Sequence, residues 1–161
     1  MSEAILKLLE PHAVLLKADV ADSTEIIRLL GNKLYKAGYV KGSFIDATID
    51  RENQLPTGLP LAGNFNAAIP HTDCEHVIKP GLALATLLKP VPFRNMAVPS
   101  ETVLVSLVFL LALDQPKAQI EMLQEIAAIL QDTEVVAALM EANEFGDVVD
   151  AIKSRKGATM Q

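Results

Sequence analysis

The most constraining feature of this sequence is a long apolar run from Val103 to Leu113, which only Ser106 interrupts. A helix needs about 20 apolar residues to cross a bilayer, so this run is too short to be a membrane span. A bounded apolar run of this length is instead typical of a buried strand. We therefore expect a strand over residues 102–112, in the interior of a soluble domain.

Shorter segments repeat this strand pattern along the chain. Apolar runs at 13–18, 67–69 and 81–88 predict strands, and 92–96 is a further candidate. The stretch from Leu55 to Asn64 contains two Pro and two Gly, which predicts turns.

Helix signals lie between and after these strands. Asp22 and Glu25 have the spacing of a capping box, and Gly38 marks the end of the apolar periodicity that follows them. Ser43 is the expected cap of a second helix, and Pro116 suits the first turn of another. The helices are expected at about 22–37, 43–53, 116–130, 133–142 and 144–153.

Helices that alternate with aliphatic strands indicate an α/β fold. The length of 161 residues, half of them hydrophobic, suits one domain with a sizeable core. We expect a single-domain sandwich over 1–161, with a core at about 5–153, in which a mixed β-sheet is flanked by helices on both faces. The tail from Ser154 onward is expected to fray.

Charge and cysteine content narrow the class of protein. A net charge of -6 argues against nucleic acid or an anionic membrane as the main partner. The single cysteine excludes an intrachain disulfide and fits a reducing compartment. No basic flank precedes a long apolar run near the first residues, so we expect no signal peptide and a cytoplasmic location.

Two of the three histidines and the only cysteine fall within the segment His71–His76. One interpretation is a metal site made by His71, Asp73, Cys74 and His76. Against it, structural zinc sites usually take two ligands from each of two separated segments, and no other segment of the sequence offers a second pair of ligands. A nucleophilic Cys74 is weaker still, because two acids flank it, so we expect a small, partly buried side chain.

A nucleophilic His71 fits the segment better. The residue follows a short strand and a proline, where a sheet ends and the chain turns at its rim. A neutral imidazole has a lone pair, and its near-neutral pKa keeps that form available at cellular pH. From residue types alone, a solvated loop histidine remains the alternative.

The wider segment from Arg51 to Asp73 resembles the phosphoacceptor signature of the fructose/mannitol-type enzyme IIA domains of the bacterial phosphotransferase system. The matching positions are Arg51-Glu52, Thr57-Gly58-Leu59 and Ala68-Ile69-Pro70-His71. The resemblance continues through the later strands and helices and covers nearly the whole chain.

This resemblance implies a phosphorelay carrier. His71 would accept a phosphoryl group on Nε2 from the phosphocarrier protein HPr, and a cysteine of the IIB component would take it. A membrane IIC component would then use it on an incoming polyol, which would not touch this subunit. The transfers would need neither a metal nor an organic cofactor.

The other site residues follow from phosphoryl chemistry. Arg51 can hold two oxygens of the passing group with its planar fork. Thr57 and nearby amides can donate hydrogen bonds to the group. Asp73 could orient the other nitrogen of His71.

One position departs from the commoner family pattern. Many members carry a second histidine near the start of the helix after the long strand, and Gln119 stands there in this sequence. A polar residue at that place, with the longer spacing from Gly58 to His71, resembles the galactitol-specific branch. A regulatory, nitrogen-type IIA protein is the alternative within the family, and the metal-binding domain is the alternative outside it.

Overall fold

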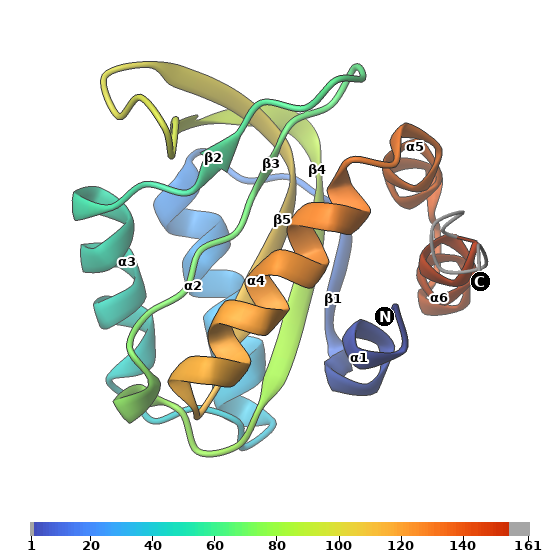
Figure 1. The fold of residues 1–161 in the computed structure, drawn as a ribbon. Helices are drawn as coiled ribbons and strands as arrows, with labels where there is room; N and C mark the ends of the chain where they lie inside the picture. The colour runs from blue at the N-terminus through green and yellow to red at the C-terminus, as the bar shows by residue number, and fades with distance from the viewer. Residues whose placement is uncertain (1, 155–161) are drawn as a thin grey trace.

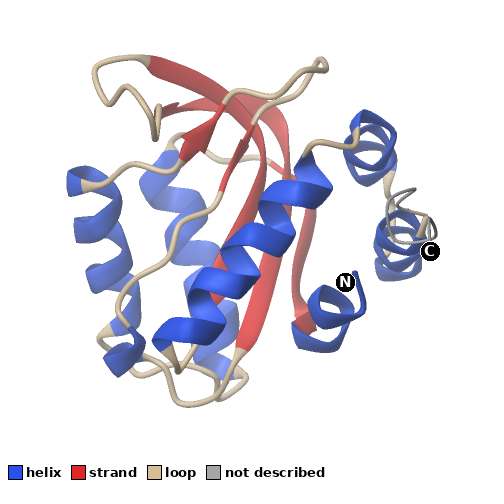
Figure 2. Ribbon diagram, in the orientation of Figure 1, coloured by secondary structure: helices blue, strands red, loops and turns tan. Residues whose placement is uncertain are grey.

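The computed structural model describes residues 2–154, which form one five-stranded mixed sheet with helices on both faces (Figures 1 and 2). The strand order is β1-β4-β5-β3-β2. The strands are β1 (Leu9–Ala18), β2 (Gly58–Leu59), β3 (Ala67–Ala68), β4 (Gly81–Arg94) and β5 (Thr102–Ala112). The helices are α1 (Ser2–Leu8), α2 (Ser23–Lys36), α3 (Phe44–Gln54), the short 3-10 helix η1 (Cys74–His76), α4 (Pro116–Leu130), α5 (Thr133–Glu141) and α6 (Phe145–Lys153).

The predicted strand at 102–112 is confirmed as β5, the central strand of the sheet. It pairs antiparallel with β4 and parallel with β3, and β1 pairs parallel with β4. From Val105 onward the strand is buried on both faces, which is why no polar alternation appears in that part of the sequence.

The expected division of β4 is wrong. One strand runs from Gly81 to Arg94, where the sequence predicted separate strands at 81–88 and 92–96. The pairing of β4 with β5 shifts in register between Thr86 and Val91, and Lys89 and Pro90 lie within this irregularity. A bulge can accommodate Pro90, which has no N–H to donate, without ending the strand.

Two apolar layers cover the sheet. In β4, Leu82 and Leu84 belong to the core beneath α1, α4, α5 and α6, whereas Ala83 and Ala85 belong to the core beneath α2 and α3. This alternation follows from the two-residue period of a strand. Figure 1 shows α2 and α3 on one side of the sheet and α4, α1 and α6 on the other, so the predicted α/β class is confirmed.

Local signals set the helix ends, with two differences from expectation. Asp22 caps α2 by accepting from the Glu25 amide, but Glu25 accepts in return from Ala21 rather than from Asp22. Gly38, at φ +88°, ends that helix region as predicted. Ser43 precedes α3 without a side-chain capping bond.

Three short elements were not predicted, and one of them is the 3-10 helix η1 at Cys74–His76. Helix α1 occupies Ser2–Leu8 and leads directly into β1, which starts earlier than expected. The strand β2 lies inside the segment 55–64 that predicted only turns, and it pairs antiparallel with β3. Within residues 2–154, no helix is long and apolar enough to cross a membrane. Most of the tail expected to fray, residues 155–161, lies outside the described residues.

Candidate functional site

His71, Arg51 and Thr57 line one pocket of about 190 Å³. Arg51 comes from the last turn of α3, Thr57 from the connection to β2, and His71 from the loop after β3. Three of the five site residues that the sequence suggested therefore come together, and Asp73 and Gln119 are not among the lining residues. The remaining lining residues are Gln54, Leu55, Pro56, Met96 and Pro99.

The ring of His71 is held by its own backbone. Nδ1 lies 2.8 Å from the Ile69 carbonyl oxygen, and because a carbonyl can only accept, Nδ1 carries the proton. The lone pair is then on Nε2, which makes no hydrogen bond to the described part of the chain. His71 is 7% exposed, so the site is recessed rather than solvated.

Burial is also the main influence on the protonation of His71. It lowers the pKa of His71 from the ordinary value of 6.5, and the positive charge of Arg51 lowers it further. The hydrogen bond to Ile69 and the charge of Asp73 act in the opposite direction. The net shift is downward, so the neutral, nucleophilic ring is the form present at neutral pH.

Arg51 is only partly engaged by the protein. Its Nη1 donates to Asp73 Oδ1 at 3.0 Å, while its Nε is buried and has no hydrogen-bond partner among residues 2–154. A buried donor without a partner is costly unless something else fills the place. A guanidinium with a free donor beside a neutral imidazole suits an anionic group.

Asp73 does not have the role that the sequence suggested. Its carboxylate pairs with Arg51, and the Nδ1 of His71 is held by Ile69 instead. The expectation that Asp73 orients the ring is therefore wrong. Ile69 and Asp73 are both two positions from His71, but the Ile69 carbonyl, directly after β3, lies 2.8 Å from Nδ1 and accepts its hydrogen bond.

Sequence reasoning gave no role to Glu52, which is 8% exposed. Its two carboxylate oxygens accept from the amide and the hydroxyl of Thr57, both at 2.8 Å. The hydroxyl proton of Thr57 is thus already donated within the protein, and direct donation from Thr57 to a phosphoryl group would require that bond to be exchanged. The sequence signal for these two hydrogen bonds is an acid five positions before a threonine, with a proline in the turn between them.

Gln119 lies apart from the lining of this pocket. It stands in the first turns of α4, where its Oε1 is 3.9 Å from Cys74 Sγ. Burial raises the pKa of the Cys74 thiol, and the carboxylates of Asp114 and Asp73 raise it further. A thiol kept protonated is a poor nucleophile, which agrees with a partly buried, structural Cys74.

The geometry does not assemble the metal site that the segment suggested. Nδ1 of His76 lies 2.8 Å from the Ser43 hydroxyl, and its Nε2 lies 3.7 Å from Glu75. Within the described residues, no three His, Cys, Asp or Glu side chains are grouped so that they could hold a metal ion.

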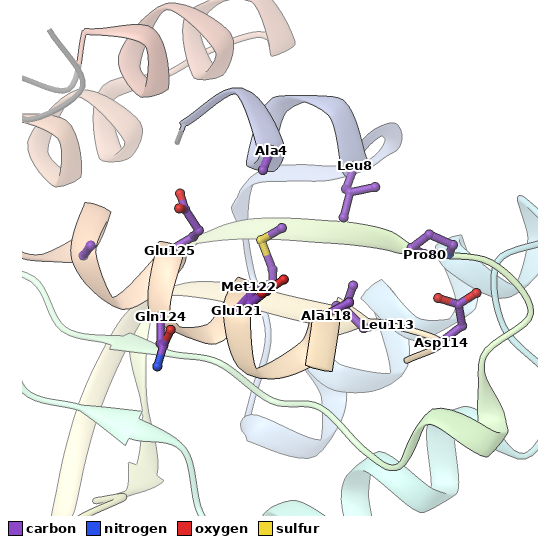
Figure 3. A pocket seen from close by; sticks show the side chains of 11 residues that line it. Ala4, Leu8, Pro80, Leu113, Asp114, Ala118, Glu121, Met122, Gln124 and Glu125 are labelled. Atoms are coloured by element: carbon purple, nitrogen blue, oxygen red, sulfur yellow. The ribbon is translucent and has the colours of Figure 1, made fainter. Parts of the chain in front are cut away.

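A larger pocket, of about 610 Å³, lies elsewhere, between α1 and α4 (Figure 3). Ala4 and Leu8 lie opposite Ala118 and Met122 across it, and Asp114 and Glu125 stand at its edges. Its described lining has acids but neither a histidine nor a cation, so the chemistry of an anionic group belongs to the smaller pocket.

Comparisons with known proteins identify the family. The family model described as "Phosphoenolpyruvate-dependent sugar phosphotransferase system, EIIA 2" matches residues 7–155. The galactitol-specific EIIA component of Escherichia coli (strain K12) is 30% identical over 123 residues, covering 76% of this chain and 81% of the relative. The mannitol-specific phosphotransferase enzyme IIA component of Geobacillus stearothermophilus is 30% identical over 140 residues, covering 85% of this chain and 89% of the relative.

A solved structure shares the fold. It is the complex of the mannitol enzyme IIA with phosphorylated enzyme IIB from Escherichia coli, which matches with a TM-score of 0.75 at 24% identity and covers 92% of this chain and 100% of that one. The match of the family model to nearly the whole chain confirms the resemblance seen in the sequence. The chain therefore belongs to the EIIA 2 family of the phosphoenolpyruvate-dependent sugar phosphotransferase system, and it is a phosphoryl-transfer component of such a system.

Proposed function

We propose that this chain accepts a phosphoryl group on Nε2 of His71 from phospho-HPr and passes it to a cysteine of a IIB component. The observation that carries the proposal is the tautomer of His71, with the proton on Nδ1 and the lone pair on Nε2. Nδ1 donates to Ile69 at 2.8 Å, so the lone pair is on Nε2, and the ring lines the same pocket as Arg51.

The two transfers are then simple substitutions at phosphorus. In the first, the Nε2 lone pair forms the new N–P bond while the bond from phosphorus to the donor breaks. The Nδ1 proton stays on the ring, where the Ile69 oxygen shares the positive charge that develops. In the second, a thiolate attacks phosphorus and the electron pair of the N–P bond returns to Nε2.

Arg51 supplies the charge for both steps. The transferring group carries negative charge on its equatorial oxygens, and Arg51 brings a cation to the pocket. We assign Gln119 a smaller, neutral supporting role, since it approaches from α4 beside Cys74 rather than from the pocket wall.

The pocket has an apolar rim that suits closure by a protein. Leu55 and Met96 line it and are both exposed, at 57% and 40%. Large exposed apolar side chains around a recessed polar group are typical of a docking surface. Exclusion of water by a docked partner strengthens the interaction of Arg51 with the phosphoryl oxygens.

We further propose that the system takes up galactitol through a membrane IIC component. The support is the galactitol-specific relative, at 30% identity, and the glutamine at position 119. The mannitol-specific relative is equally identical, so the choice of IIB component must decide between the two polyols.

The test is incubation of the purified protein with phosphoenolpyruvate, enzyme I and HPr, followed by mapping of the phosphorylated atom. We expect one phosphoryl group per chain on Nε2 of His71 and none on the His71→Ala variant. His76→Ala and Cys74→Ser are matched controls from the same loop, and both should keep most of the activity. Phosphate on another residue, or a fully labelled His71→Ala variant, would sink the proposal.

The second half of the test offers the phosphorylated protein to IIB components of the galactitol and mannitol systems. We expect discharge to the galactitol component to be the faster. Preferential discharge to the mannitol component would move the assignment to mannitol, and discharge to neither would favour a regulatory role.

A further inference from the structure

A chain of hydrogen bonds leads from a buried acid to the histidine ring. Glu52 accepts from the Thr57 hydroxyl at 2.8 Å, and that hydroxyl accepts from the Ile69 amide at 3.2 Å. The carbonyl of Ile69 then accepts from Nδ1 of His71 at 2.8 Å. Three segments that are separate in the sequence are joined in this way: α3, the connection to β2, and the loop after β3.

Glu52 sets the direction of the Thr57 hydroxyl, the one group in that chain that can either donate or accept. Both of its carboxylate oxygens accept hydrogen bonds from Thr57, one from the amide and one from the hydroxyl. Because the hydroxyl proton goes to Glu52, the Thr57 oxygen presents a lone pair to the Ile69 N–H. Burial raises the pKa of the Glu52 carboxyl, and the two bonds from Thr57 oppose that shift, as expected if they favour its ionised form.

The backbone beside His71 is held from two sides. On one side, the Ile69 amide bonds to the hydroxyl and the carbonyl of Thr57, at 3.2 and 3.4 Å. On the other side, the Pro70 carbonyl accepts from the Leu111 amide of β5 at 3.1 Å. The Thr57 hydroxyl is therefore one of the groups that hold the Ile69 carbonyl in place to accept from Nδ1 of His71.

We propose that Glu52 is a positioning residue for His71: acting through Thr57 and Ile69, it fixes the Nδ1–H tautomer and the orientation of the ring. For phosphoryl transfer the inference rests on the proposed role of His71 Nε2. The tautomer itself is a property of the protein without any partner.

The chain offers a closely matched set of variants. Thr57→Val removes the hydroxyl and nearly keeps the shape, and Thr57→Ser restores the hydroxyl. Thr48→Val is the control, since Thr48 is also a fully buried threonine, in α3, and its hydroxyl bonds only to Phe44 of the same helix. Glu52→Gln keeps the size of the acid but replaces one acceptor by a donor that faces the donors of Thr57.

The first measurement uses protein labelled with ¹⁵N in histidine, without phosphate and without partners. In the wild-type protein the shifts of His71 should show a proton on Nδ1 and a bare Nε2 at neutral pH. Thr57→Val and Glu52→Gln should move both nitrogens toward the averaged values of exchanging tautomers. Thr57→Ser and Thr48→Val should match the wild-type spectrum.

The second measurement is single-turnover transfer from phospho-HPr at equal folded concentration. We expect Thr57→Val to lose about ten-fold in rate, on the scale of one hydrogen bond, with Thr57→Ser close to wild type. Glu52→Gln should lose a similar amount, and the double variant should lose little more, because both act through one chain.

The two readouts separate the possible failures. Wild-type ring shifts in folded Thr57→Val, or equal changes in Thr48→Val, would overturn the positioning role whatever the activity shows. A wild-type protein that takes no phosphate on His71 would overturn the proposed function, and the ring shifts would still decide the role of Glu52. Should Glu52→Gln not fold, the Thr57 pair decides alone.

Discussion

Arg51 and Asp73 form an ion pair, with Nη1 3.0 Å from Oδ1, and both charges act on the ring of His71 in opposite directions. The Asp73 side chain is 70% exposed and that of Arg51 is 32% exposed. In the proposed transfer, an incoming phosphoryl group would replace the exposed carboxylate as the partner of the guanidinium. The pair holds Arg51 in place in the free protein.

The charges of this pair predict opposite changes in the titration of His71. Arg51→Ala should raise the pKa of His71, because a nearby cation is lost, and Asp73→Asn should lower it, because a nearby anion is lost. The measurement is an NMR titration of the ring, with Asp46→Asn as a control that should change nothing. Shifts of the same sign in the two site variants would contradict the electrostatic assignment.

The lowered pKa of His71 also predicts a pH dependence of stability. Below the ordinary value of 6.5 the unfolded chain binds a proton at this residue before the folded protein does. The contribution of His71 to the free energy of unfolding should thus be constant above that pH and fall as the pH drops from it toward the folded pKa. Urea unfolding of wild type and His71→Gln between pH 5 and 8 tests this, and a difference between the two that does not depend on pH would contradict it.

The charge-stabilising role proposed for Arg51 predicts a large kinetic effect. Arg51→Ala should slow transfer from phospho-HPr by ~10²-fold or more, since such arginines neutralise the transferring group. Arg51→Lys should recover only part of the rate, because a point charge cannot hold two oxygens as the fork does. Arg28→Ala removes an exposed arginine from α2 and should leave the rate unchanged. A near-wild-type rate in Arg51→Ala would place the role elsewhere.

Gln119 should matter less than Arg51. It offers one neutral hydrogen bond and does not line the pocket, so Gln119→Ala should cost about ten-fold at most in the same rapid-quench measurement. Gln119→His restores the commoner family pattern and should be tolerated. A loss in Gln119→Ala that exceeds the loss in Arg51→Ala would reverse the assignment of the two residues.

The close approach of Gly58 to the Arg94 backbone predicts that a side chain at position 58, next to the site, lowers the stability of the fold. A Cβ at this position would lie 2.5 Å from the Arg94 carbonyl oxygen, so Gly58→Ala should destabilise the fold by about 1–3 kcal/mol. Gly146→Ala is the matched control, because a Cβ there meets nothing within 4 Å and should stabilise α6 by about 0.4–1 kcal/mol. Urea unfolding checks both, and equal effects would show that the contact with Arg94 relaxes freely.

How far the sequence could predict the fold depended on whether the signal was local. The apolar run of β5 and the Asp22 cap of α2 are local, and both were predicted. The strand β2 consists of Gly58 and Leu59, and only its pairing with β3 makes it a strand, so no local pattern reveals it. Pro90 looked like a strand end because the sequence does not show the bulge that accommodates it.

The site shows the same limit. The resemblance to the family suggested His71, Arg51 and Thr57, and the fold brings them to one pocket. The sequence suggested Asp73 as the partner of the ring, and only the structure shows that the Ile69 carbonyl lies 2.8 Å from Nδ1 instead. Glu52 lies in a polar stretch that looks solvated, and its burial depends on the packing of α3 against the rest of the fold.

The recessed position of His71 has a consequence for the order of events. The proposed relay uses one acceptor atom, Nε2 of His71, at the pocket of about 190 Å³, and both partners of that relay must reach it. Donor and acceptor proteins therefore compete for the same opening and cannot be bound there together. Steady-state transfer should follow ping-pong kinetics. An excess of unphosphorylated HPr should inhibit discharge to the IIB component, because it would occupy the opening of the His71 pocket.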